Sequence, residues 1–255
     1  MNEWSAGDIY ESYVGRWSRV VAEEFVGWLA QPAGLRWLDV GCGTGALTST
    51  ILRRADPASV LGVDPSEGFI GYARKTVDDE RAGFEVRSAA ELPDGPYDAV
   101  VAGLVLNFIP ERVEALRRMR EIGSTVAVYV WDYADGMQLM RYFFDAVAEV
   151  RPQDREHDEG IRFSFCTPEG LEEMFIAAGF TTVGTRDIVV PTEFSSFDDY
   201  WQPFLGGQGV APAYLRSLPE ADQEVLREAV RSRLPIEADG SIRLTARAWA
   251  AKATS

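Results

Sequence analysis

The sequence predicts an α/β fold in which a seven-stranded, mostly parallel sheet carries helices on both faces. Three observations support this prediction. Short apolar runs alternate with amphipathic segments between residues 35 and 131, as in consecutive βα units. A glycine-rich turn joins the first strand to the helix that follows it. The chain has 255 residues, of which 46% are hydrophobic, and this is enough for one packed domain with insertions.

The expected strands are short runs of apolar residues bounded by turn residues. The run at 97–102 is almost continuously apolar, which is typical of a parallel strand buried on both faces. The strand–helix alternation stops after Trp131, and two later strands complete the sheet. The seven expected strands cover residues 36–40, 60–64, 84–87, 97–102, 124–131, 181–190 and 242–251.

Helices are expected where apolar residues recur at helical spacing. Ser66 is suited to cap a helix over residues 67–77. Thr167-Pro168-Glu169 combines a capping hydroxyl, a proline at the first helical position and an acid at the positive end of the helix dipole. The other expected helices lie within residues 8–30, 46–54, 111–122, 136–150 and 220–233.

We therefore expect a Rossmann-like domain over residues 35–255, preceded by a helical segment over residues 1–34 that closes over a bound ligand. Two segments, at about 133–166 and 195–240, interrupt the later part of the sheet and are expected to form a helical lid. The strongly charged stretch 151–160 is expected to be a loop.

The net charge, the apolar runs and the cysteines of the sequence indicate which partners and which cellular compartment to expect. The formal net charge is −15, and an acidic surface repels the phosphates of nucleic acids and anionic membranes, so neither is expected as a partner. No apolar run approaches a membrane span, and no signal core follows the first methionine. Cys42 and Cys166 are expected as reduced thiols, which indicates a cytoplasmic protein. We expect the protein to be a monomer or a homodimer.

The turn after the first strand is the main candidate binding motif. Gly41, Gly43 and Gly45 stand where a strand ends and a helix begins, and glycines there permit a tight turn and close approach of a ligand to the backbone. Asp39 precedes them by two residues. A nicotinamide dinucleotide site using Gly41, Gly43 and Ala46 would place a pyrophosphate beside this acid, which is unfavourable.

S-adenosylmethionine suits the turn better, because it carries an ammonium and a sulfonium that an acid such as Asp39 favours, and no phosphate. Asp64 supports this reading, since it ends the second strand 19 residues after Gly45, where an acid reaches the ribose hydroxyls of an adenosine. A turn without any ligand is the third possibility.

The motifs of residues 38–47, 62–73, 87–93 and 97–110, taken in order, resemble those of class I S-adenosylmethionine-dependent methyltransferases. The resemblance is to the group related to ubiquinone and menaquinone biosynthesis and to natural-product methyltransferases. It implies that this chain binds S-adenosylmethionine, releases S-adenosylhomocysteine and methylates a small molecule.

The resemblance also implies roles for single residues. Asp39, Gly41 and Gly43 would meet the methionine moiety, and Asp64 would hold the ribose. The remaining cofactor positions would be Ala90 and Glu91 beside the adenine, Gly103 near the sulfonium, and Tyr13 and Arg16 over the methionine carboxylate, unless these last two belong to a solvated helix.

The catalytic residue stays open. Relatives often have a histidine after the fourth strand, and this chain has Asn107 there. The single histidine, His157, stands in a charged run that is usually solvated, although a lid could carry it to the acceptor as a base. With one histidine and two distant cysteines, no metal site is expected.

The sequence predicts transfer of a methyl group to an oxygen, nitrogen or carbon atom of a small molecule, and the aromatic residues and methionines of the lid favour an aromatic or apolar acceptor. Two alternatives remain: a cofactor-binding protein that does not methylate, and a nicotinamide-dependent oxidoreductase on a related sheet.

Overall fold

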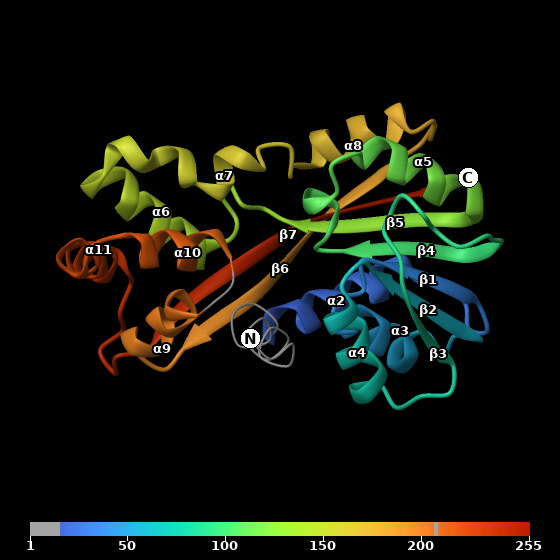
Figure 1. The fold of residues 1–255 in the computed structure, drawn as a ribbon, viewed down its shortest axis with the longest axis horizontal. Helices are drawn as coiled ribbons and strands as arrows, with labels where there is room; N and C mark the ends of the chain where they lie inside the picture. The colour runs from blue at the N-terminus through green and yellow to red at the C-terminus, as the bar shows by residue number, and fades with distance from the viewer. Residues whose placement is uncertain (1–15, 207–208) are drawn as a thin grey trace.

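The computed structural model describes residues 16–206 and 209–255, and its centre is a seven-stranded sheet (Figure 1). The strands lie in the order β3-β2-β1-β4-β5-β7-β6. Strands β1 to β5 are parallel to one another, whereas β7 runs antiparallel to both β5 and β6. The predicted sheet is confirmed. Its strands are β1 (Arg36–Val40), β2 (Ser59–Asp64), β3 (Ala82–Val86), β4 (Tyr97–Gly103), β5 (Gly123–Trp131), β6 (Gly184–Phe194) and β7 (Ile242–Thr254).

Helices cover both faces of this sheet. In Figure 1, α2, α3 and α4 lie on one face, and α5 and α8 lie on the other. The connections on the β2 side of β1 therefore cover one face and the connection on the β4 side covers the other, as a doubly wound sheet requires. These helices are α2 (Arg16–Leu29), α3 (Ala46–Arg54), α4 (Glu67–Thr76), α5 (Arg112–Ile122) and α8 (Pro168–Ala177).

Two predicted helix starts are confirmed by their capping bonds. The backbone N–H of Phe69 donates to the Ser66 hydroxyl over 3.2 Å, and that of Gly170 donates to the Thr167 hydroxyl over 3.0 Å. Each cap satisfies a backbone donor that the first turn would otherwise leave unpaired, which typically contributes about 1 kcal/mol.

The core lies between the central strands and the helices on either face. Val100 and Val101 of β4 are fully buried, as their continuous apolar run predicts. Phe25 of α2 packs against Tyr129 of β5, with ring centroids 4.5 Å apart. The leading helix is thereby fixed to the sheet beside the ends of β4 and β5.

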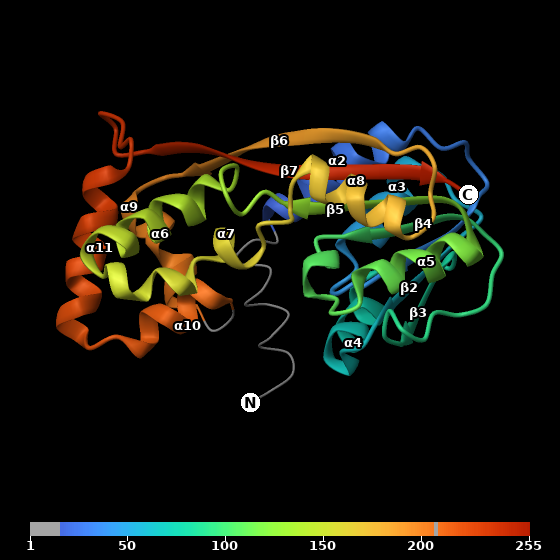
Figure 2. The same ribbon diagram turned by 90° about the horizontal axis from the view of Figure 1, so that it is seen from above.

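The two predicted lid segments fold together as one helical lobe. Figure 2 shows β6 and β7 extending from the sheet into this lobe. Phe143 from the first segment stacks on Phe204 from the second, with centroids 4.6 Å apart, and the hydroxyl of Tyr200 donates to the carbonyl of Leu139 over 2.7 Å. The lobe consists of α6 (Gln138–Val150), η3 (Pro152–His157), α7 (Glu159–Arg162), α9 (Phe197–Trp201), η4 (Gln202–Leu205), α10 (Val210–Ser217) and α11 (Glu220–Arg233).

The prediction of a loop at 151–160 is wrong, because this stretch forms η3 and the start of α7. Pro152 occupies the first position of η3, and Arg151 pairs with Asp154 over 2.6 Å. Asp158 then caps α7, since its carboxylate accepts from the N–H of Gly160 over 2.8 Å. The charges that suggested a solvated loop are thus used within short helical turns.

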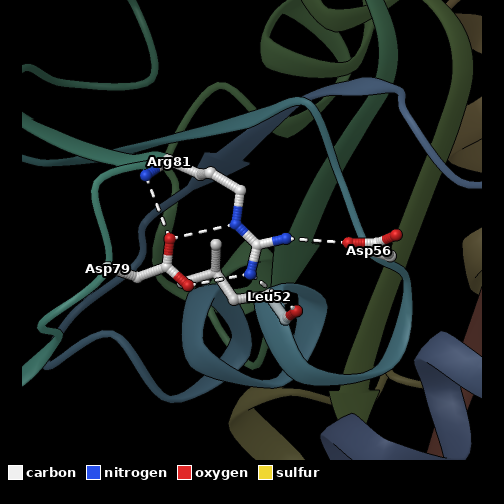
Figure 3. Close-up of polar contacts among 4 residues, drawn as sticks. All are labelled: Leu52, Asp56, Asp79 and Arg81. Carbon is white, nitrogen blue, oxygen red and sulfur yellow. Dashed lines mark hydrogen bonds and ion pairs between the residues drawn. The ribbon is translucent and has the colours of Figure 1, made fainter.

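A polar cluster joins the connections that precede β2 and β3, at the amino-terminal edge of the parallel strands (Figure 3). The guanidinium of Arg81 donates to both carboxylate oxygens of Asp79 at 3.0 and 2.8 Å, to Asp56 at 2.9 Å and to the carbonyl of Leu52 at 3.4 Å. These hydrogen bonds hold the pKa of Asp79 down at about 2. The cluster fixes the ends of α3 and α4 on the edge opposite the glycine turn.

Two further observations concern the chain as a whole. Cys42 and Cys166 are both buried and free, as expected. No helix within the described ranges is long and apolar enough to cross a membrane.

Candidate functional site

The glycine turn lies at the topological switch point of the sheet, where the order in which strands are added reverses. β1 lies between β2 and β4, and the connection that leaves β1 through α3 covers one face of the sheet, whereas the connection that leaves β4 through α5 covers the other. In open α/β sheets a crevice forms at this point, because neighbouring connections diverge there. The residues that follow β1, β2 and β4 therefore converge on one site.

The glycine turn has the backbone that its residues predict. Gly41, Gly43 and Gly45 all have positive φ, at 71°, 54° and 88°. The N–H groups of Gly41 and Cys42 both donate to the carbonyl of Val63, over 2.7 and 3.0 Å. The left-handed region is costly for other residues, so glycine permits this turn at little cost.

Gly41 also has no room for a side chain. A Cβ built there would lie 2.5 Å from Cγ2 of Val105, which follows β4. The turn after β1 and the segment after β4 are therefore in direct contact, and the two motifs form one wall of the site.

Asp39 is buried beneath this turn. Its Oδ2 accepts a hydrogen bond from the hydroxyl of Thr48 over 2.7 Å, whereas its Oδ1 is buried and has no partner among the described residues. Burial raises the pKa of Asp39 to about 7, although the Thr48 hydrogen bonds lower it. A buried acceptor left open in this way calls for a donor from outside, and a cation is the favourable one.

Asp64, at the end of β2, ties the turn to the next helix. Its two carboxylate oxygens accept from the N–H groups of Gly43 and Ser66, over 3.0 and 2.9 Å. Burial raises its pKa, and these backbone bonds oppose the rise. Each oxygen retains acceptor capacity for a hydroxyl group of a ligand.

Two adjoining chambers meet at this edge of the sheet, with volumes of about 160 and 500 Å³. Asp39, Gly43 and Thr44 line the smaller chamber only, and Ser88, Ala89 and Ala90 line the larger one only. The walls that both share are Gly41, Asp64, Val105 and Phe108. The predicted methionine positions Asp39 and Gly43 thus line one chamber, and Ala90, one of the two predicted adenine positions, lines the other, with Asp64 on the wall that the chambers share.

The smaller chamber includes residues that sequence reasoning missed. Gly103 lines it, and a Cβ at Gly103 would lie 2.5 Å from the hydroxyl of Tyr129, while its place near the sulfonium remains a prediction. Ser18, Leu104 and Tyr129 also line the chamber. Leu104 has a φ of 58°, and such a conformation in a non-glycine residue often marks a functional site. A tyrosine inside an apolar strand was the one signal that could have been noticed.

The other predicted cofactor residues have different placements. Glu91 is exposed and does not line either chamber, so its adenine role remains a prediction. Tyr13 lies outside the described residues. Arg16 is the first described residue and begins α2, and its role also remains a prediction.

The two weak catalytic candidates differ in surroundings. Asn107 is buried, its amide donates to the hydroxyl of Tyr133 over 3.2 Å, and its Oδ1 has no partner within the described part of the chain. His157 is exposed in the helical lobe, and its ring packs on Tyr214 with centroids 4.9 Å apart. Only Asn107 adjoins Phe108, which lines both chambers.

Comparison with known protein families gives a partial match. Residues 38–123 match the model of a methyltransferase domain. This range runs from β1 to the first residue of β5 and contains the glycine turn, Asp64 and the segment after β4.

Curated relatives match parts of the chain. A trans-aconitate 2-methyltransferase of Mycolicibacterium gilvum is 41% identical over 98 residues, which cover 37% of each chain. One of Methylobacterium nodulans is 36% identical over 92 residues, or 36% of this chain and 34% of the relative. The human mitochondrial ubiquinone biosynthesis O-methyltransferase is 29% identical over 66% of this chain and 46% of its own. The matched part of the chain therefore spans about a third to a half of the length of these relatives.

Solved structures share the fold over nearly the whole chain. Phosphoethanolamine N-methyltransferase 2 of Haemonchus contortus, solved with phosphomonomethylethanolamine and S-adenosylhomocysteine, has a TM-score of 0.57 at 16% identity, covering 97% of this chain and 56% of that one. A plantazolicin methyltransferase, solved with a monoazolic desmethylplantazolicin analogue and S-adenosylhomocysteine, has a TM-score of 0.53 at 15% identity, covering 96% of this chain and 89% of that one.

Proposed function

We propose that the chain is a class I S-adenosylmethionine-dependent methyltransferase, which transfers a methyl group from S-adenosylmethionine to an oxygen, nitrogen or carbon atom of a small acceptor. The observation that carries the proposal is the open acceptor at Asp39, buried under a glycine turn at the switch point of the sheet. A nicotinamide dinucleotide would bring a pyrophosphate to this carboxylate, so the oxidoreductase alternative is disfavoured.

The residues present fit this cofactor from end to end. Asp39 Oδ1 supplies an acceptor for the ammonium of its methionine part, and Asp64 has acceptor capacity left for the ribose hydroxyls. Ser88, Ala89 and Ala90, whose side chains are small, offer an end of the larger chamber for the adenine. The smaller chamber suits the amino acid part, and the larger one suits the nucleoside.

The bound cofactor supplies an activated methyl group on a sulfonium, so the protein's tasks are to orient both partners and exclude water. The glycine turn and Asp39 hold one end, and Asp64 fixes the middle. Gly103 lacks a side chain where β4 ends, which leaves the smaller chamber open beside the Tyr129 hydroxyl. Together these groups can set the direction in which an acceptor must approach.

We place the acceptor beside Phe108. This ring is 59% exposed although it lines both chambers, and its edge packs against Phe163 with centroids 5.6 Å apart. Phe163 in turn contacts Tyr133, with centroids 4.9 Å apart. An aromatic wall of this kind favours a flat or apolar acceptor. Asn107, next to Phe108, has an open amide oxygen and is the candidate to receive a hydrogen bond from the acceptor.

The helical lobe is proposed as the lid over this acceptor, and the N-terminal segment 1–34 as the cover of the cofactor. Two free, buried thiols support a reducing compartment, so we also propose a cytoplasmic enzyme, as a monomer or homodimer. The net charge of −15 argues against nucleic acid as the acceptor.

The direct test is equilibrium binding of S-adenosylmethionine by titration calorimetry. The native chain should bind it, and Asp64→Ala should weaken binding at least tenfold. Asp64 also anchors the turn, so circular dichroism must show that the variant is folded. Absence of binding at high micromolar cofactor would refute the proposal, whereas tight binding without turnover over a broad acceptor screen would favour the non-methylating alternative.

A further inference from the structure

The larger chamber continues beyond the place proposed for the adenosine. It runs from Gly41 and Asp64 past Ala90 and along one face of α5. That face carries Glu111 at the helix start, and then Glu114, Ala115 and Arg118, all of which line the chamber. Seven residues of helix between the first and last of these correspond to about 10 Å of chamber wall.

This face of α5 is open because the connection before β4 is short. The other connections between parallel strands carry the helices α3, α4 and α5. Residues 87–96, all of which the structure describes, contain only a turn at positions 89–90. That connection has no helix to cover α5 and touches it near its last turns, through Asp94 on Arg118 and Gly95 beside Ile122. The opposite side of the helix is buried through Leu116 and Met119.

The volume of the larger chamber is more than the adenosyl part of the cofactor fills, if both chambers are filled to the same degree. Its volume is about three times that of the smaller chamber. The adenosyl part of the cofactor has roughly twice as many non-hydrogen atoms as the methionine part, so at equal filling a space of about one further ring remains.

The walls of the extra space are apolar, and most charges at its rim are already paired. Ile109, Pro110 and Ala115 form the inner surface. The guanidinium of Arg118 pairs with Asp94 over 3.2 Å and with Glu121 over 3.1 Å. Two other rim charges also have partners, with Arg87 on Glu85 and Glu114 on Arg117. Among the described residues, Glu111 is the one charged lining residue of this helix face without an ion pair, so the subsite disfavours an anionic group and suits a neutral one.

We propose that Ile109, Pro110, Ala115 and Arg118 form a second binding subsite, the α5 subsite, which takes an aromatic or branched apolar group attached to the adenine of an adenosyl ligand. This inference rests on the proposed function, since it places the adenine end of the ligand at Ser88–Ala90. The aromatic group would lie on the apolar wall, with the Arg118 guanidinium placed to stack on its face.

The test compares S-adenosylhomocysteine with its N6-benzyl analogue by titration calorimetry on the native chain. The analogue should bind about tenfold more tightly, because its ring leaves water for the apolar wall. A gain below threefold, or weaker binding of the analogue, would overturn the subsite while leaving the proposed function intact. If neither compound bound, both the proposed function and the subsite would be refuted.

Variants of α5 then locate the gain. Ala115→Phe fills the subsite and should abolish the advantage of the analogue while changing the affinity for S-adenosylhomocysteine less than threefold. Glu114→Trp, at the exposed rim, gives the same test if the buried substitution prevents folding. Glu121→Trp lies on the same helix outside the chamber and leaves Arg118 its partner Asp94, so the advantage should persist. An advantage that survived Ala115→Phe or Glu114→Trp in a folded protein would place the benzyl group elsewhere and overturn the inference.

Discussion

Thr48 donates its hydroxyl hydrogen bond to Oδ2 of Asp39 over 2.7 Å, which leaves Oδ1 of the same carboxylate buried and open. The bond connects the end of β1 to the first turns of α3 and fixes the carboxylate under the glycine turn. A carboxylate that is oriented but incompletely paired weakens the ligand-free protein and favours a cationic ligand. Two predictions follow from this arrangement.

Asp39→Asn should stabilise the ligand-free chain while abolishing cofactor binding. Burial raises the pKa of Asp39 from an ordinary 3.8 to about 7, so the folded state holds a proton that the unfolded state has lost. Stability therefore falls as pH rises from about 4 to 7, and stays lower above that. The variant lacks this cost, and urea unfolding at pH 8 should show a gain of about 2 to 4 kcal/mol. A gain that persisted at pH 3.5, where both side chains are neutral, would contradict the explanation.

The affinity for S-adenosylhomocysteine should fall as pH falls through 7. Only the ionised Asp39 attracts the ligand's ammonium, and at pH 6 roughly a tenth of it remains ionised if the pKa is near 7, so affinity should drop about tenfold from pH 8. Calorimetry at several pH values measures this. Thr48→Val removes a hydrogen bond that lowers the pKa of Asp39, so the transition in affinity should move to a higher pH. A transition at a lower pH would show that the assignment to Asp39 is wrong. An unshifted transition would assign it to Asp64, whose pKa is also raised.

Gly41→Ala should destabilise the fold more than Gly43→Ala. Both positions have positive φ, but a Cβ at Gly41 meets Val105 at 2.5 Å, whereas one at Gly43 meets nothing within 4 Å. The difference in unfolding free energy should be about 1 to 3 kcal/mol. Adding Val105→Ala to Gly41→Ala should recover part of it. Equal costs for the two glycines would show that the contact with Val105 is unimportant.

Loss of the Arg81 cluster should lower stability without affecting the ligand site. Its hydrogen bonds lower the pKa of Asp79 to about 2, so its contribution is present above pH 4 and is lost as pH falls toward 2. Asp79→Asn should therefore lower the melting temperature at pH 7, and the difference from the native chain should shrink at pH 2.5. The affinity for S-adenosylhomocysteine should change less than twofold, because the cluster precedes β2 and β3 and the ligand site follows β1 and β2, at the opposite edge of the sheet. A larger change in affinity would mean that the two edges are coupled.

His157→Ala should leave methyl transfer unchanged once an acceptor is known. The ring is exposed and packs on Tyr214 in the helical lobe. Asn107→Ala should instead lower kcat at least tenfold, since Asn107 is buried beside Phe108. Initial rates for the two variants separate these cases, and a loss of kcat at His157 alone would revive the role of a lid-borne base.

Local patterns predicted most of the fold because they carry their own physical cause. The apolar runs of β1, β4 and β5 and the hydroxyl caps at Ser66 and Thr167 depend on neighbouring residues only. The order of the strands and the glycine turn then placed Asp39, Asp64 and Gly103 around one site, as expected from their positions at strand ends.

Other features depend on contacts between distant segments, and no local pattern indicates them. The two lid segments form one lobe because Phe143 meets Phe204, which are far apart in the sequence. The short helices at 152–162 depend on pairs such as Arg151 with Asp154, and the same charges equally suit a loop. The open face of α5 follows from the missing helix between β3 and β4, which no single residue reveals.

The central claim is that the glycine turn and Asp39 hold S-adenosylmethionine, and a crystal structure with S-adenosylhomocysteine tests it most directly. The account predicts that the ligand's ammonium lies about 3 Å from Oδ1 of Asp39, with the ribose hydroxyls on Asp64 and the adenine at Ala89 and Ala90. Density for the ligand at another place, or with its ammonium turned away from Asp39, would contradict the account.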